Sequence, residues 1–169
     1  KDILEVQFEG KNIDDILTMT VDDAVAFFTQ HKQTKIMQKL QPLQDVGLGY
    51  VQLGQSSSTL SGGEAQRIKL ATFLVKGVTK EKALFVFDEP TTGLHFHDIK
   101  KLLASFEALI DKGHSIIVIE HNLDLIKCAD HIIDIGPEGG ENGGYVLARG
   151  TPEKDEKNKK SITGQYLKE

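Results

Sequence analysis

The chain has 169 residues, of which 39% are hydrophobic and 27% are charged, a composition typical of a globular protein with one substantial core. The formal net charge of −5 provides no general basic field for nucleic acid, so any contact with DNA must come from a local patch. Cys128 is the only cysteine, which excludes an internal disulfide and a multi-cysteine zinc site within the sequence. No apolar stretch approaches the ~20 residues of a membrane span, and a reducing, cytoplasmic setting is expected.

Helical patterns dominate the N-terminal part of the chain. Residues 3–8 alternate weakly between apolar and polar types before Gly10, which predicts a short strand and a turn. Thr20, followed three positions later by Asp23, predicts a capped helix that ends near residue 31. The next helical pattern meets Pro42, which removes a backbone donor and predicts a kink or an end.

A glycine pair opens the following helical pattern. In the run Leu60-Ser61-Gly62-Gly63-Glu64, the residues Ser61 and Glu64 have the spacing of a capping box, so a well-capped helix is one interpretation. Capping does not explain Gly62 and Gly63, because glycine in a helix costs about 1 kcal/mol relative to alanine. Glycines at this position expose backbone N–H groups at the positive end of the helix, and Ser61 adds a hydroxyl donor. We therefore favour an anion-binding site here.

Two adjacent carboxylates follow a short apolar run. Residues 84–87 show no polar alternation, which predicts a strand buried on both faces within a parallel sheet. Asp88 and Glu89 then stand at the carboxyl end of that strand, where open α/β sheets bind ligands. Asp88 has the position of a Mg²⁺ ligand and Glu89 that of a base that polarises water. The alternative is a strand followed by two solvated acids.

The remaining pattern alternates between helices and strands. A helical stripe follows His95 and ends by Gly113, a second apolar strand spans 115–120, and Asn122 caps a short helix. Further strands are predicted at 131–135 and 145–148, around a glycine-rich loop at 136–144. This order predicts an α/β fold with right-handed crossovers and a parallel sheet. A solvated surface segment and a terminal helix are expected after residue 152.

These motifs together resemble those of ABC-type ATPases. Residues 60–64 resemble the signature motif, 84–89 the Walker B strand, 91–95 the D-loop region, and His121 the switch histidine. More narrowly, the segments around these motifs resemble the C-terminal half of the damage-sensing ATPases of the bacterial excision-repair nuclease. The similarity covers nearly the whole chain. It implies a partial P-loop NTPase fold, with a parallel sheet flanked by helices and a helical signature region on the N-terminal side.

The resemblance also implies roles for individual residues. Asp88 would bind Mg²⁺, Glu89 would act on the attacking water, and His121 would contact the γ-phosphate on closure. The γ-phosphate of ATP held by a different lobe would meet the signature residues Ser61, Gly62, Gly63 and Glu64. ATP and Mg²⁺ are thus the implied cofactors. Zinc would belong only to a cysteine module expected just before Lys1, and the P-loop would lie further upstream.

The implied function is control of DNA binding and of partner loading by ATP in nucleotide excision repair, within the SOS response. The implied partners are damaged double-stranded DNA, the B component of the excinuclease, a second nucleotide-binding lobe and, in the full-length protein, a second copy; no membrane is involved. The start at Lys1 and the missing P-loop suggest an excised C-terminal piece that does not turn over ATP alone. The expected parts are a helical region at 1–59, the signature-to-switch region at 60–152 and a polar tail at 153–169. The alternatives are the ATPase lobe of a transporter, of a chromosome-maintenance protein or of a self-resistance paralogue.

Overall fold

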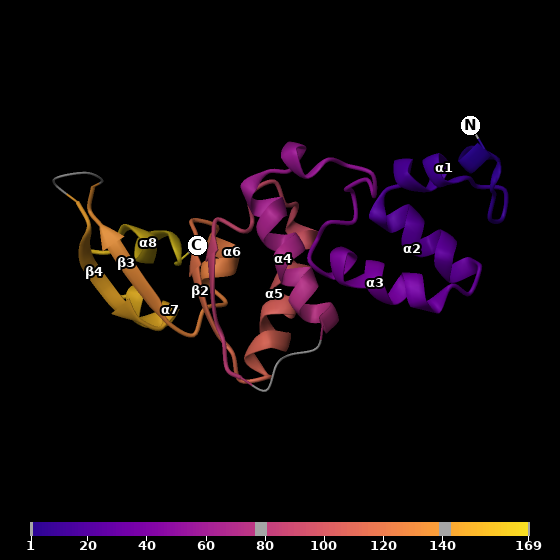
Figure 1. Ribbon diagram of the computed structural model, residues 1–169. Coiled ribbons are helices and arrows are strands. Elements are labelled where there is room, and N and C mark those ends of the chain that lie inside the picture. Colours follow the sequence, from indigo (N-terminus) through magenta and orange to yellow (C-terminus); the bar gives the residue numbers. More distant parts are fainter. Residues whose placement is uncertain (1, 77–80, 139–142, 169) are drawn as a thin grey trace. The chain divides into compact units, whose positions relative to one another are not determined.

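Residues 2–76, 81–138 and 143–168 are described by the computed structural model of the chain (Figure 1). The chain divides into two compact units, Lys1–Ile119 and Glu120–Glu169, and each is described by itself. This division differs from the boundaries expected at residues 59 and 152, which stay predictions. Across the described ranges, no helix combines the length and the apolar character needed to cross a membrane.

The first unit opens with helices. They are a 3₁₀ turn η1 (Asp2–Glu5) and the helices α1 (Ile13–Thr18), α2 (Val21–Gln30) and α3 (Thr34–Asp45). The strand predicted at residues 3–8 is wrong, because only Phe8 forms a β-bridge, with Lys11 across the turn at Gly10. A lone apolar alternation has no neighbouring strand to pair with here, so the backbone closes locally instead.

The capping predictions are confirmed in α2 and fail in α3. Thr20 Oγ1 accepts a hydrogen bond from Asp23 N at the start of α2, which ends at Gln30. Helix α3, in contrast, continues through Pro42 to Asp45. Proline removes only one intrahelical donor, and Val46 N still donates to Pro42 O (3.2 Å), so the last turn closes.

The second half of this unit contains a parallel strand pair and its helices. In chain order the elements are the 3₁₀ turn η2 (Ser57–Thr59), α4 (Gly62–Lys76), β1 (Leu84–Asp88), α5 (Phe96–Ile110) and β2 (Ser115–Ile119). Strands β1 and β2 pair in parallel with Leu84 opposite Ser115. Phe85 packs edge-on against Phe73 of α4, with ring centroids 5.0 Å apart, and Phe87 packs against Phe106 of α5 at 4.9 Å. The predicted parallel sheet flanked by helices is confirmed.

The prediction that the first strand is buried on both faces is wrong. Leu84 and Val86 are each 61% exposed, whereas Phe87 is 5% exposed. Successive side chains of a strand point to opposite faces, so the phenylalanines meet the helices and the aliphatic residues point away from them. On β2 the same alternation leaves Ile117 and Ile119 more than half exposed.

The second unit is a hairpin with short helices. Its elements are α6 (Leu123–Ile126), β3 (Ile132–Gly136), β4 (Tyr145–Gly150), α7 (Pro152–Asp155) and α8 (Ile162–Tyr166). Strand β3 pairs antiparallel with β4, so the prediction that it extends the parallel sheet is wrong. The solvated segment expected after residue 152 is also wrong in part. Asp155 and Ser161 are 2% and 0% exposed, because they bury polar groups against β3.

Candidate nucleotide-contacting site

The predicted signature turn forms a complete capping box. Ser61 Oγ accepts a hydrogen bond from Glu64 N (3.2 Å), and Glu64 Oε2 accepts one from Ser61 N (2.7 Å). Because Ser61 Oγ acts as an acceptor in this bond, its own hydrogen can still be donated to another group. The first turn of α4 therefore presents a fixed hydroxyl beside the positive end of a fifteen-residue helix.

The two glycines of this turn have different surroundings. A Cβ placed on Gly62 would meet nothing within 4 Å, and this residue is exposed. A Cβ on Gly63 would lie 3.2 Å from Arg67 Nη1 and 3.4 Å from the backbone oxygen of Glu89. Gly63 thus allows α4 to approach the segment after β1, whereas Gly62 leaves the backbone open to an approaching group.

The two predicted carboxylates stand at the carboxyl end of β1. Asp88 is the last residue of the strand, and the backbone N–H of Glu89 continues the ladder by donating to Ile119 O (2.9 Å). Glu89 has a φ of 47°, a left-handed conformation that is uncommon for a residue with a side chain. Such strain costs about 1–3 kcal/mol and clusters at functional sites, where the surrounding structure maintains it. Both side chains are exposed.

Helix α4 holds this segment from two sides. Gln66 binds the backbone of Asp88 twice, because Nε2 donates to Asp88 O (2.9 Å) and Oε1 accepts from Asp88 N (3.1 Å). Arg67 Nη1 donates to Pro90 O (2.6 Å) and to Thr92 O (3.3 Å). The signature helix and the backbone around the acid pair are therefore joined by four side-chain to backbone hydrogen bonds.

Tyr50 links the same arginine to the capping box. Its hydroxyl donates to Glu64 Oε1 (2.6 Å) and accepts from Arg67 Nη2 (3.4 Å). Burial, followed by the hydrogen bond to Glu64, raises the pKa of Tyr50. The hydrogen bond from Tyr50, followed by that from Ser61 N, lowers the pKa of Glu64. Burial lowers the pKa of Arg67, and the contacts with Tyr50 and Glu64 oppose that effect.

Gln66, Arg67 and Tyr50 were not among the residues predicted for the site. One signal for Arg67 is present in the sequence, since it falls on the same helical face as Leu70 and Ala71, which are buried. A buried arginine requires acceptors, because an uncompensated charge in a core is costly. Which carbonyl oxygens accept from it depends on the path of the chain after β1, and no sequence pattern reveals that path.

His121 lies in the second unit, just before helix α6. Its backbone N–H donates to Glu120 Oε2 (2.9 Å), which also accepts from Asn122 N (3.1 Å). Asn122 in turn caps α6, with Oδ1 accepting from Asp124 N and Leu125 N. The Glu120 carboxylate thus fixes the backbone that carries the histidine, and the His121 side chain is exposed.

The residues at the end of β1 suit a metal that is shared with phosphate. Mg²⁺ is usually bound through one or two carboxylates, several waters and substrate phosphate oxygens, and not by a protein cage. In keeping with that mode, the described part of the chain contains no group of three or more His, Cys, Asp or Glu side chains that could hold an ion by itself. Asp88, exposed at the strand end, fits such a single-carboxylate ligand.

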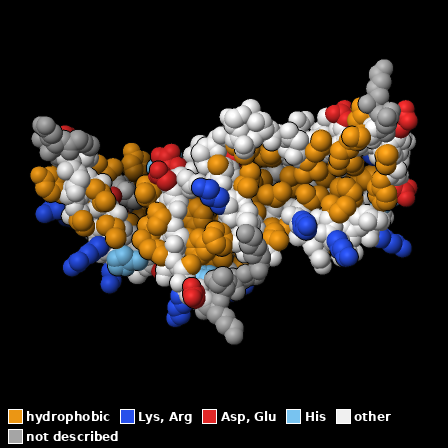
Figure 2. All heavy atoms as spheres, viewed as in Figure 1, with side chains coloured by type: hydrophobic (Ala, Val, Ile, Leu, Met, Phe, Trp, Pro, Cys, Tyr) orange, Lys and Arg blue, Asp and Glu red, His pale blue; other side chains and the backbone are white. Residues whose placement is uncertain are grey.

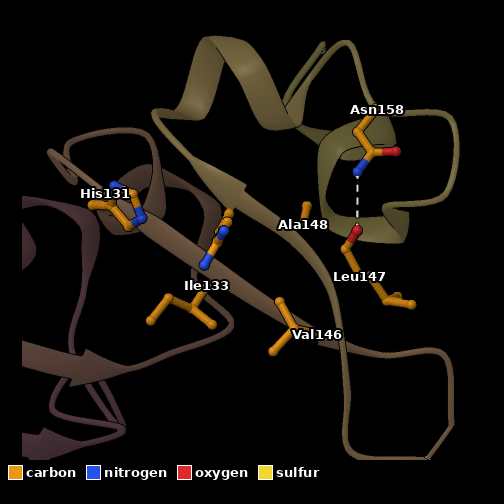
Figure 3. Close-up of a pocket in the computed structure, with 7 residues that line it drawn as sticks. His131, Ile133, Val146, Leu147, Ala148 and Asn158 are labelled. Atoms are coloured by element: carbon orange, nitrogen blue, oxygen red, sulfur yellow. Dashed lines mark hydrogen bonds between the residues drawn. The ribbon is translucent and has the colours of Figure 1, made fainter.

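Two further hollows lie away from these residues. One is an open depression on the β3–β4 hairpin, lined by His131, Ile133 and residues 146–149, where Asn158 Nδ2 donates to Leu147 O (Figure 3). The other is an apolar groove at the N-terminal helices, where hydrophobic side chains gather on the surface (Figure 2). Neither contains a residue that the sequence predicted for the site.

The fold and these contacts define a class of protein. A parallel strand that ends in two acids, beside a capped helix that begins with glycines, has the arrangement of an ABC-type ATPase, and the predicted fold class is confirmed. No family model matches the chain. The chain is 58% identical over 168 residues to the UvrABC system protein A of Clostridium acetobutylicum, and equally so to that of Aquifex aeolicus, which in each case covers 99% of this chain.

A solved structure agrees with the sequence matches. The crystal structure of UvrA2 from Deinococcus radiodurans covers 99% of this chain with a TM-score of 0.82 and 44% identity. The predicted resemblance to the damage-sensing ATPase of the excision-repair nuclease, UvrA, is therefore confirmed over the whole chain. The chain spans 18% of the length of these curated relatives and 20% of the chain of that structure.

Proposed function

We propose that this chain is the part of a UvrA-type ATPase that supplies the signature turn, the acid pair and the switch histidine. In this proposal, ATP binding and hydrolysis control the binding of damaged double-stranded DNA and the loading of the B component of the excinuclease. A second nucleotide-binding lobe, a homodimeric full-length protein and a cytoplasmic location follow from the same assignment. The observation that carries it is the contact of the signature helix with the acid pair, through Gln66 and Arg67.

The signature turn is assigned to the γ-phosphate of ATP bound by another lobe. Ser61 offers its hydroxyl, and Gly62 and Gly63 offer backbone N–H groups at the positive end of α4. Glu64 belongs to this group of residues through the capping box, since both its carboxylate oxygens already accept hydrogen bonds. Its contribution is to hold Ser61 in place while the other residues approach the phosphate.

The acid pair and the histidine are assigned to the hydrolytic step. Mg²⁺, when bound with ATP, neutralises charge on the phosphate oxygens, and Asp88 would hold it directly or through a water. Glu89 orients and polarises the attacking water by accepting a hydrogen bond from it. His121 donates a hydrogen bond to the γ-phosphate. One chain thus contributes to two composite sites, the signature turn to one and the acid pair to the other.

A chimera tests this assignment without requiring the chain to act alone. In it, this chain replaces the matching segment of the Clostridium acetobutylicum relative, with the other hydrolytic site disabled. We expect Glu89→Gln to bind ATP normally and to hydrolyse it about 10²–10⁴-fold more slowly, because the amide preserves shape but not basicity. Steady-state hydrolysis and nucleotide binding measure the two effects.

The 169-residue chain alone is the control for this experiment. We expect it to show no measurable ATPase activity and no rise in melting temperature with Mg-ATP, because its sequence lacks the lysine of a P-loop. Hydrolysis at an unchanged rate in the Glu89→Gln chimera would contradict the role given to Glu89.

A further inference from the structure

Three polar links meet at the Tyr50 hydroxyl and the Glu64 carboxylate. Tyr50 joins one carboxylate oxygen to Arg67, and the other carboxylate oxygen accepts from Ser61 N. Arg67 continues the chain of hydrogen bonds to the backbone oxygens of Pro90 and Thr92. A continuous polar path therefore runs from the signature turn to the segment that follows the acid pair.

Tyr50 is anchored at its backbone and free of the core at its ring. The loop that carries it is fixed to the start of α2, where Val21 N donates to Val51 O and Asp22 N donates to Gly49 O (both 2.9 Å). The neighbouring Val51 is 8% exposed, whereas Tyr50 itself is 49% exposed. The hydroxyl thus projects from a rigid support, and its removal leaves little packing to lose.

From this geometry we infer that Tyr50 is a positioning residue, which holds the signature turn and the acid-pair segment as one unit during ATP hydrolysis. This inference rests on the function proposed above. The hydroxyl acts through two partners: it restrains the Glu64 carboxylate that holds Ser61, and it supplies an acceptor to Arg67, which holds Pro90 and Thr92. Tyr50 touches neither nucleotide nor water in this role.

The inference predicts non-additive effects on hydrolysis. In the chimera we expect Tyr50→Phe to lower kcat about 2- to 10-fold, the range for loss of one hydrogen bond, with KM for ATP unchanged. Glu64→Gln should lower kcat to a similar extent, because it weakens the same link. If the two residues act as a unit, the double variant loses no more than the larger single loss; independent structural roles would multiply the two losses.

Two controls separate this effect from a general loss of structure. Tyr145→Phe removes a hydroxyl from a ring that is 64% exposed in the other unit, and we expect it to leave kcat unchanged. Melting temperatures of the Tyr50 and Glu64 variants should stay close to that of the parent chimera. An unchanged kcat in Tyr50→Phe, or losses that multiply in the double variant, would overturn the positioning role.

A measurement on the 169-residue chain keeps the inference testable apart from activity. Loss of the Tyr50 hydroxyl should free the Glu64 carboxylate, so amide hydrogen exchange at Ser61 should become faster, whereas exchange in α5 should not change. Unchanged exchange at Ser61 would overturn the inference even if Glu89→Gln confirms the proposed function. Faster exchange combined with unaffected hydrolysis in Glu89→Gln would instead contradict the proposed function alone.

Discussion

Each unit of the molecule buries one ionisable side chain, and the two environments have opposite consequences. Arg67 is 0% exposed and donates to the carbonyl oxygens of Pro90 and Thr92. Asp155 is 2% exposed and shares the hydroxyl of Ser161 with the carboxylate of Asp134. Burial lowers the pKa of Arg67 and raises that of Asp155. Arginine stays charged because its ordinary pKa is above about 12, whereas Asp155 is driven toward its neutral form.

Counting protons in the second unit supports this difference. Ser161 Oγ lies 2.6 Å from Asp134 Oδ2 and 2.9 Å from Asp155 Oδ2, and it also accepts from Gly164 N. A hydroxyl has one hydrogen, so it cannot donate to both carboxylates. A proton on Asp155 resolves the conflict, since Asp155 can then donate to Ser161, which donates to Asp134. The lesson is that a buried charge persists where acceptors surround it and is neutralised where a like charge does.

Removal of the buried arginine should have the largest effect on stability. Arg67→Met retains much of the side-chain volume but leaves two buried carbonyl oxygens without a donor, which costs about 1–3 kcal/mol each. We expect the free energy of unfolding of the chain to fall by about 2–4 kcal/mol in urea titrations. Arg67→Lys should recover only part of this loss, because one ammonium group cannot reach three acceptors in the same fork geometry. Full stability in Arg67→Met would show that the contacts contribute little.

The glycine pair should separate function from stability. Gly62→Ala places a methyl group in open space, so we expect stability to rise by up to about 1 kcal/mol from helix propensity. Gly63→Ala crowds Arg67 and the backbone of Glu89, so we expect a loss of about 1–2 kcal/mol instead. Urea unfolding measures both. In the chimera both variants should hydrolyse ATP more slowly; normal hydrolysis by Gly62→Ala would reduce that glycine to a feature of the helix start.

The buried carboxyl should make stability depend on pH in a specific direction. Because the pKa of Asp155 is raised in the folded state, its contribution is fully present below the unfolded pKa of about 3.9 and is lost as pH rises through the folded pKa. We expect Asp155→Asn, which mimics the neutral form, to remove this part of the pH dependence and to be relatively more stable at higher pH. Unfolding titrations between about pH 4 and pH 8 measure the slope. Glu156→Gln, at the end of the same short helix, is the control and should leave the slope unchanged.

The smallest expected effect is relief of strain at the acid pair. Glycine adopts a φ of 47° without a side-chain penalty, so Glu89→Gly should be more stable than Glu89→Gln by up to about 1 kcal/mol. Both variants lose the same carboxylate, so their difference isolates the backbone term. Thermal unfolding of the two proteins provides the comparison. Glu89→Gln being the more stable variant would mean that this backbone conformation is not strained.

Local patterns in the sequence were sufficient wherever one element decides the outcome. The capping box of Ser61 and Glu64, the cap of α2 at Thr20 and the cap of α6 at Asn122 were all predicted correctly, because each depends on residues within three positions. The two parallel strands were also predicted, since apolar runs followed by polar residues identify them. The roles assigned to Asp88, Glu89 and His121 stay predictions.

Only the tertiary structure decided how these elements combine. The antiparallel pairing of β3 with β4 and the exposed face of β1 depend on which surfaces meet, and strand composition alone does not distinguish those choices. The same holds for the left-handed backbone at Glu89, which the surrounding contacts impose against its intrinsic preference. Gln66 and Arg67 find their acceptors far along the chain, because folding and not sequence spacing brings α4 to the end of β1.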